Sequence, residues 1–212
     1  MNWRSQPRDP KTGQWVAKGG GIAAAGALAV AMYGSGGTAA TGGAAAAGEA
    51  AGAADSVSVA ARNSARKTKS DKEWKRLRLR TVKQAVENAV DCAANSYGDI
   101  TDYFLQNPCR SLDRTLITLA DPNGATFVVS VSWVRMRARS DVAPLKREID
   151  RDGTGSIAPL GWSLLKARGV RFTGVPFRSR VDGDTLVIAE GAVVSGTPGP
   201  AYQAAVEAAA WL

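Results

Sequence analysis

The sequence predicts an α+β fold, in which an antiparallel sheet of about four strands has helices packed on one face and follows a long basic amphipathic helix. Three observations lead to this prediction. Two hairpin patterns, in residues 111–136 and 170–194, supply the strands. Apolar residues at helical spacing surround the hairpins. Because no long strand–helix alternation is present, the pattern favours antiparallel over parallel pairing.

Composition divides the chain into four parts. Residues 1–18 form a basic N-terminal tail, and residues 19–61 form an Ala/Gly-rich, largely uncharged segment and linker. Residues 62–94 form the basic amphipathic helix, and residues 95–212 form the α+β domain. The first ninety residues hold 14 Lys and Arg against 6 Asp and Glu, whereas the remainder holds 13 of each. The excess positive charge therefore lies before the domain.

The Ala/Gly-rich segment is a candidate membrane or signal segment. Its strongly apolar run spans residues 22–33, a length that suits the core of a signal peptide better than a complete span. Basic residues precede this run and Ala-x-Ala triplets follow near residues 44–47, which is the order of an export signal. A flexible Ala/Gly linker without a membrane role is the alternative.

The basic helix is predicted from its cap and its periodicity. Ser70 and Glu73 fit a capping box. From Trp74 to Ala93, apolar residues recur at the spacing of one helical face, and residues 95–98 supply a stop signal. We expect this apolar stripe to dock on the domain.

Positive charge is concentrated in residues 62–83 of the basic helix. Nine of these side chains are candidate contacts to lipid or nucleic acid: Arg66, Lys67, Lys69, Lys72, Lys75, Arg76, Arg78, Arg80 and Lys83. On an anionic membrane each would add about 1 kcal/mol of binding. On nucleic acid they would neutralise phosphates and give salt-sensitive binding. A solvated face that keeps the chain soluble is the alternative.

The domain begins with a short helix over 100–106, followed by strands over 111–119 and 126–136 around a turn at 121–124. The strand at 126–136 has the clearest pattern, because apolar residues and serines alternate along it. The remaining elements are a helix capped by Ser140, a short helix over 160–166, strands over 170–181 and 185–194, and a final helix over 200–212. An Asp-Gly pair between the last two strands is a hairpin turn signal.

Cys92 and Cys109 are the two cysteines of the chain. A disulfide between them would close an interval of 17 residues, stabilise the fold by about 3 kcal/mol in the loop-entropy account, and indicate an oxidising compartment. The alternative is a pair of buried free thiols in a cytosolic core.

The absence of histidine excludes Ser-His-Asp and Cys-His catalysis and every histidine-ligated metal site. Residues 150–157 imitate the first eight positions of an EF-hand loop, but Gly161 stands where the bidentate Glu belongs. Ser163 and Lys166 have the spacing of a Ser-Lys pair, and packing of a short amphipathic helix explains them more simply. We therefore predict no catalytic residue, no cofactor and no metal site, and we expect the protein not to be an enzyme.

A longer pattern joins the two cysteines to the clearest strand. Asp-Cys-Ala-Ala-Asn-Ser-Tyr-Gly at 91–98 leads to Asn-Pro-Cys-Arg-Ser-Leu-Asp-Arg at 107–114, and Val-Ser-Val-Ser-Trp-Val-Arg-Met follows at 129–136. Over roughly residues 91–190 this succession resembles a group of uncharacterised actinomycete proteins, many of which carry a membrane segment before a similar domain. The resemblance implies a membrane-associated domain and supplies no catalytic residues.

These observations favour a membrane-tethered or exported α+β module with a binding or structural role, located at the cell membrane or outside the cytoplasm. Its expected partner is an anionic membrane surface or an envelope protein, and no small-molecule substrate is identified. The alternative is a cytoplasmic, nucleic-acid-associated protein of a mobile element that binds through residues 62–83.

Overall fold

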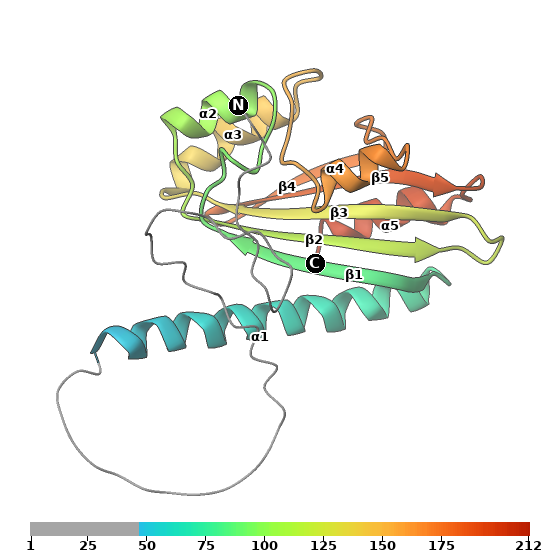
Figure 1. Cartoon of the computed structure of the whole chain (residues 1–212), viewed down its shortest axis with the longest axis horizontal. Helices are drawn as coiled ribbons and strands as arrows, with labels where there is room; N and C mark the ends of the chain where they lie inside the picture. The colour runs from blue at the N-terminus through green and yellow to red at the C-terminus, as the bar shows by residue number, and fades with distance from the viewer. Residues whose placement is uncertain (1–46) are drawn as a thin grey trace, which may run out of the picture. The chain divides into compact units, whose positions relative to one another are not determined.

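A five-stranded antiparallel sheet lies at the centre of the fold (Figure 1). The computed structural model describes the backbone of residues 47–212 and the side chains of residues 58–212. The strands are β1 (Arg80–Ala89), β2 (Ser111–Ala120), β3 (Thr126–Arg135), β4 (Phe177–Asp182) and β5 (Thr185–Ser195). Their order across the sheet is β1-β2-β3-β5-β4, and every neighbouring pair is antiparallel. The predicted α+β class with an antiparallel sheet is confirmed, with one strand more than expected.

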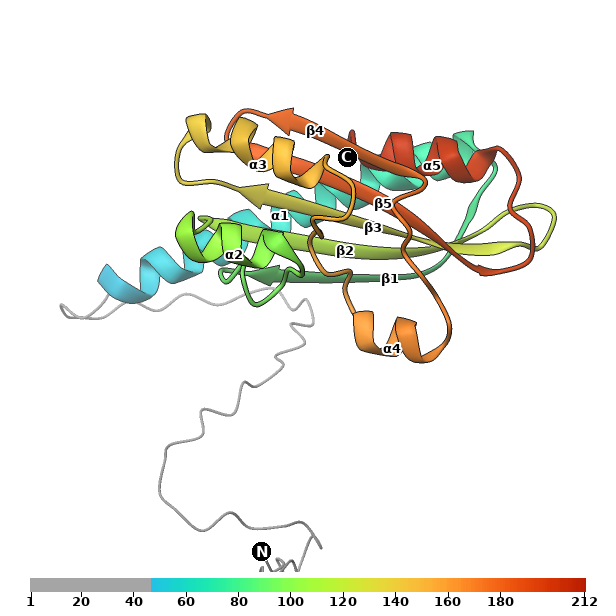
Figure 2. The ribbon, with the colours of Figure 1, turned by 90° about the horizontal axis from the view of Figure 1, so that it is seen from above.

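Helices cover both faces of the sheet (Figure 2). The helices are α1 (Ala47–Arg76), α2 (Asp99–Gln106), α3 (Val142–Ile149, after a 3₁₀ turn at Arg139–Asp141), α4 (Trp162–Ala167) and α5 (Ala201–Ala209). α1 and α5 pack on one face, which we call the α1 face. α2 and α3 pack on the opposite face, which we call the α3 face. The prediction that helices pack on one face is therefore wrong.

The alternation of β3 explains why the sheet has two cores. Phe127, Val131 and Trp133 lie in the apolar cluster of the α1 face. Val134, on the other side of the strand, joins the cluster of the α3 face, together with residues of α2 and α3. Successive side chains of a strand point to opposite faces, so one strand supplies apolar residues to both layers.

The predicted helix over 62–94 is wrong for the residues of β1. The helix α1 ends at Arg76, and residues 80–89 form an edge strand that pairs with β2, from Arg80 opposite Ala120 to Ala89 opposite Leu112. Ser70 lies inside α1 and its hydroxyl donates to the carbonyl oxygen of Lys67 at 2.8 Å, so the predicted capping box is not formed. A serine within a helix satisfies its hydroxyl in this way.

α1 ends in a Schellman motif that lacks the usual glycine, so it could not be predicted from the sequence. Arg78 has φ 57°, the left-handed conformation that glycine usually supplies at this position. The Leu79 N–H donates to the carbonyl oxygen of Trp74 at 2.8 Å, and the Arg78 N–H donates to that of Lys75 at 3.1 Å. Trp74 and Leu79 are both buried in the α1-face core, which is the apolar contact that accompanies this motif. The motif turns the chain from α1 into β1.

Arg78→Gly is expected to raise the free energy of unfolding by about 1 kcal/mol. A left-handed conformation costs a non-glycine residue roughly 1–2 kcal/mol, and the greater freedom of glycine in the unfolded chain removes part of the gain. Urea unfolding of both proteins measures the difference. Arg80→Gly, in an extended strand, is the matched control and should be destabilising. A loss of stability in Arg78→Gly would contradict the strained turn.

A disulfide joins Cys92 to Cys109, which confirms that prediction. The two Cα atoms are 6.1 Å apart, and both side chains are buried in the α3-face core. The bond ties the segment after β1 to the segment before β2 and closes a loop that contains α2. The other expected elements of the domain are present, except that β4 begins at Phe177 and not at Val170. The cap predicted at Ser140 is not formed, because Ser140 lies in the 3₁₀ turn before α3 and its hydroxyl donates to the Asp141 carboxylate at 3.1 Å.

Candidate functional site

Two loops far apart in sequence cross on the α3 face. Tyr97 donates its N–H to the carbonyl oxygen of Ser156 at 3.0 Å, and Ala158 donates to that of Asn95 at 2.8 Å. An antiparallel bridge pairs Ser96 with Ile157 between them. We call residues 95–98 and 155–158 together the strap.

Two glycines allow the strap to close. Gly98 has φ +66° and Gly155 has φ +96°, and their Cα atoms lie against each other's backbone. A Cβ on Gly155 would overlap the carbonyl oxygen of Tyr97, and a Cβ on Gly98 would overlap that of Thr154. The glycine-rich turn that imitates an EF-hand loop therefore serves as a packing surface. Asp150 at its start is ion-paired with Lys146 of α3.

Arg114 of β2 fixes the strap to the sheet. Its side chain is 8% exposed. One terminal nitrogen donates to the carbonyl oxygen of Ala158 at 2.9 Å, and the other donates to the Asn95 side chain at 2.7 Å and pairs with Glu87 of β1. The arginine thus joins two strands and both loops.

A cavity of about 500 Å³ opens beside the strap. Its walls come from the strap, the turn at 149–153, the segment at 172–175 and the strands β4 and β5. Tyr97, Phe172 and Phe177 supply aromatic surface, and Glu190 of β5 is the buried charged residue of the lining. This volume lies within the roughly 300–1,000 Å³ of small-molecule sites. A neighbouring cavity of about 250 Å³ beside α4 shares Phe172 and Thr173 with it.

Glu190 is a buried carboxylate without a counter-charge. The residue is 7% exposed and stands opposite Ser130 of β3 in the middle of the sheet. The N–H of Gly174 donates to its Oε1 at 2.8 Å, and none of the described lysines and arginines forms an ion pair with it. Burial raises the pKa of Glu190, and the Gly174 hydrogen bond opposes this shift in part.

Tyr97 stays neutral beside this carboxylate. Burial, and then the negative charge of Glu190, raise the pKa of Tyr97 to about 12. Its ring meets the ring of Trp162 edge to face, with 4.3 Å between the centroids. The cavity wall here is therefore an uncharged aromatic surface held by α4.

Glu190→Gln is expected to stabilise the protein at neutral pH and to have little effect in acid. Because the pKa of Glu190 is raised above its ordinary 4.5, the folded state binds this proton more tightly than the unfolded chain. The free energy of unfolding of the wild type is therefore highest at pH values below the ordinary pKa of 4.5, and it falls as the pH rises through the raised pKa of Glu190. Glutamine does not titrate.

Thermal unfolding of both proteins from about pH 4 to pH 8 measures this effect. Each kcal/mol of relief should raise Tm by about 2–4 °C in a chain of this size. Glu207→Gln, on the exposed side of α5, is the matched control. A difference in Tm between Glu190→Gln and the wild type that does not change with pH would contradict the conclusion that Glu190 lacks a counter-charge.

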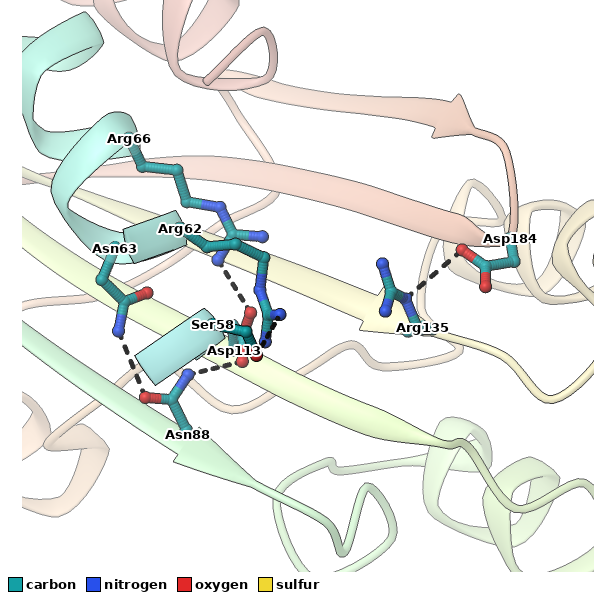
Figure 3. A network of polar contacts seen from close by, with 8 residues as sticks. All are labelled: Ser58, Arg62, Asn63, Arg66, Asn88, Asp113, Arg135 and Asp184. Carbon is teal, nitrogen blue, oxygen red and sulfur yellow. Dashed lines mark hydrogen bonds and ion pairs between the residues drawn. The ribbon is translucent and has the colours of Figure 1, made fainter. Parts of the chain in front are cut away.

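Arg66, one of the nine predicted contact residues, lies in the interface between α1 and the sheet (Figure 3). Its guanidinium is 2.8 Å from the Asp113 carboxylate and stacks over the Trp133 ring, 3.9 Å from its centroid. Asn88 of β1 also donates to Asp113, and Asn63 donates to Asn88 at 3.3 Å. Burial lowers the pKa of Arg66, and Asp113 opposes this shift. Arg66 thus docks α1 on β2 and β3.

The other eight predicted residues are exposed. Lys67 pairs with Asp71, Arg76 pairs with Glu73, and the Lys69 ammonium donates to the carbonyl oxygen of Trp211. The remaining five form no ion pair with the described residues: Lys72, Lys75, Arg78, Arg80 and Lys83. These five lie on the last turns of α1, the turn that follows and the start of β1.

Glu190 and Arg114 were not predicted from the sequence. Glu190 is the one charged residue between Leu186 and Val194, and a lone charge within an apolar strand is the signal that could have found it. Arg114 carries no such signal, because its partners come from a crossing of two distant loops.

The chain matches no family model, and no curated protein or solved structure is similar to it at a significant level. Among residues 47–212, no helix has the length and apolar character needed to cross a membrane, and no group of three or more acidic or cysteine side chains could hold a metal ion. The basic tail at 1–18, the apolar run at 22–33 and residues 44–46 of the predicted triplets lie outside the described residues, whereas Ala47 begins α1.

Proposed function

We propose that this chain is a membrane-tethered or exported binding module whose site is the cavity beside the strap. The observation that carries the proposal is Glu190, a buried carboxylate without a counter-charge in the wall of an open cavity. Burying an unpaired charge is costly, and such groups concentrate at functional sites. The described domain thus retains a destabilising group where a ligand can reach it.

Binding fits this arrangement better than catalysis. A single carboxylate next to a neutral tyrosine lacks the second titrating partner that acid–base chemistry uses. The strap is held by backbone hydrogen bonds, by Arg114 and by two close-packed glycines. Such a wall is pre-formed, which lowers the conformational cost of binding.

Three features support a location at the membrane or outside the cytoplasm. The Cys92–Cys109 disulfide is typical of oxidising compartments. The order of basic tail, apolar run and Ala-x-Ala triplets in residues 1–47 is typical of an export signal. The resemblance expected for residues 91–190, to uncharacterised actinomycete proteins of which many carry a membrane segment, would point the same way.

Fractionation with thiol trapping tests the location. The chain is expressed in an actinomycete host, free thiols are tagged before lysis, and membrane, cytoplasmic and secreted fractions are compared by mass. We expect untagged protein in the membrane or secreted fraction. Cytoplasmic protein with both thiols tagged would contradict the proposal. A variant with both cysteines replaced by alanine gives the reference for untagged mass.

The five exposed cations without ion pairs favour a second candidate function, which is sequence-independent binding of nucleic acid. In that case the affinity for a labelled DNA duplex should fall steeply with salt, because each phosphate contact releases counterions. Charge reversal at Lys72 and Lys75 should weaken binding, whereas reversal at the exposed Lys166 of α4 should not. Weak affinity that is indifferent to salt would exclude this function.

A further inference from the structure

The charged side chains that line the cavity are predominantly negative. Glu190, Asp150 and Asp152 are acidic, and Arg151 is the one basic residue of the lining. Asp150 is neutralised by Lys146, and Arg151 is neutralised by Glu148. Glu190 and Asp152 have no ion pair with the described residues. The cavity therefore presents uncompensated negative charge, one part of it buried.

The rest of the cavity wall is aromatic and apolar. Tyr97, Phe172 and Phe177 lie around it, and Ile149 and Val175 add aliphatic surface. Aromatic faces attract cations, and apolar walls favour an apolar stem. Because the Tyr97 phenol stays protonated, it adds a ring and a hydroxyl without adding charge.

From this combination, and resting on the proposed function, we infer that the cavity binds an organic cation, namely an ammonium or guanidinium group carried on an apolar stem. The cationic head is placed against Glu190 and the stem against the aromatic side chains. The head supplies the counter-charge that the fold itself does not supply to Glu190. Binding would therefore relieve the cost of burying this carboxylate.

Two other ligand classes fit the lining less well. An anion would meet the charge of Glu190 at close range in a poorly solvated place. A hard metal cation requires about six to eight oxygen ligands, and the described residues offer no cluster of three acidic side chains.

A matched series of probes tests the inference by calorimetry. Hexylamine, 1-hexanol and hexanoate share one apolar stem and differ in the charge of the head. We expect hexylamine to bind about tenfold or more tightly than hexanol, since a hydrogen bond to a charged group is worth more than a neutral one, and hexanoate not to bind. Ammonium chloride alone should not compete, because it lacks the stem.

Variants assign the effect to Glu190. Glu190→Gln should bind hexylamine and hexanol with nearly equal affinity, while its thermal unfolding shows that the fold is retained. Glu207→Gln should behave as the wild type. Retention of the preference for hexylamine in Glu190→Gln would overturn the inference.

The remaining outcomes separate the inference from the proposed function and separate two sources of the cation. Equal binding of hexylamine and hexanol by the wild type would overturn the inference that the ligand is a cation, but it would leave the proposal of a binding module standing. No binding of any probe at millimolar concentration would count against both.

Blocked lysine, in the form N-acetyl-lysine amide, and a short lysine peptide complete the series. Tighter binding of the peptide identifies a protein side chain as the source, and tighter binding of hexylamine identifies a free amine.

Discussion

Replacing Cys92 and Cys109 with alanine is expected to lower the free energy of unfolding by about 3 kcal/mol. The bond closes a 17-residue interval, and its loss returns conformational entropy to the unfolded chain. Both sulfurs also lie in the α3-face core, so their removal takes buried surface from α2 and α3. We expect α2 to lose protection from hydrogen exchange first, because it lies within the closed loop.

Urea unfolding with and without reductant measures this effect. Reduction of the wild type breaks the S–S bond and removes no side-chain atom from the core. It should therefore produce most of the loss in the free energy of unfolding. The double alanine variant should be insensitive to reductant, which is the control. A change smaller than about 1 kcal/mol in either experiment would contradict the role given to the disulfide.

Arg114→Met is expected to lower the free energy of unfolding by about 3 kcal/mol. Methionine keeps much of the apolar stem but leaves the carbonyl oxygen of Ala158, the Asn95 side chain and Glu87 without their donor. Each acceptor that stays buried and unsatisfied costs about 1–3 kcal/mol, and Glu87 is exposed enough to regain water. The loss should therefore come mainly from the two strap contacts.

The same change should weaken binding in the cavity, although Arg114 does not line it. Without the arginine the strap is less firmly held, so the Tyr97 wall is less well ordered and hexylamine affinity should fall. Hydrogen exchange at the Tyr97 and Ala158 amides should accelerate together. Arg110→Met, at an exposed position just before β2, is the matched control. A loss of stability no greater than that of the control would contradict the role of Arg114.

The strands could be predicted where alternation and turn chemistry agree. Residues 129–133 of β3 alternate between apolar side chains and serine, and Asp182-Gly183 marks the β4–β5 hairpin. β1 was missed because Val82, Ala85, Val86 and Ala89 recur at the spacing of one helical face, which predicts a helix. The signal that would have separated helix from strand was a glycine after the last turn of α1, and Arg78 occupies that place.

The second layer of helices was missed for a related reason. The alternation of apolar residues with Ser130 and Ser132 is typical of a strand with one apolar face, yet both serines are buried on the α3 face. Polar strand residues can be buried where a cavity or a polar network needs them, and pattern alone does not distinguish this case from exposure.

The candidate site was largely beyond sequence reasoning. The two cysteines could be paired because they are the only two, whereas the strap joins residues 95–98 to residues 155–158 through contacts that no local pattern encodes. Arg66 was predicted as a surface contact from its basic neighbours. Its actual place depends on Asp113 and Trp133, which lie on two different strands.

The reciprocal packing of Gly98 and Gly155 has a consequence for how this sequence can diverge. The space that a side chain on either glycine would need is filled by backbone of the other loop, chiefly the carbonyl groups of Tyr97 and Thr154, so a substitution at the partner position cannot make room for it. In related chains that keep the cavity, both positions should stay glycine together. Gly153, whose Cβ would meet nothing within 4 Å, should vary to asparagine or aspartate. A relative that has lost one of the two glycines should also have lost the other, and with it the wall that Tyr97 forms.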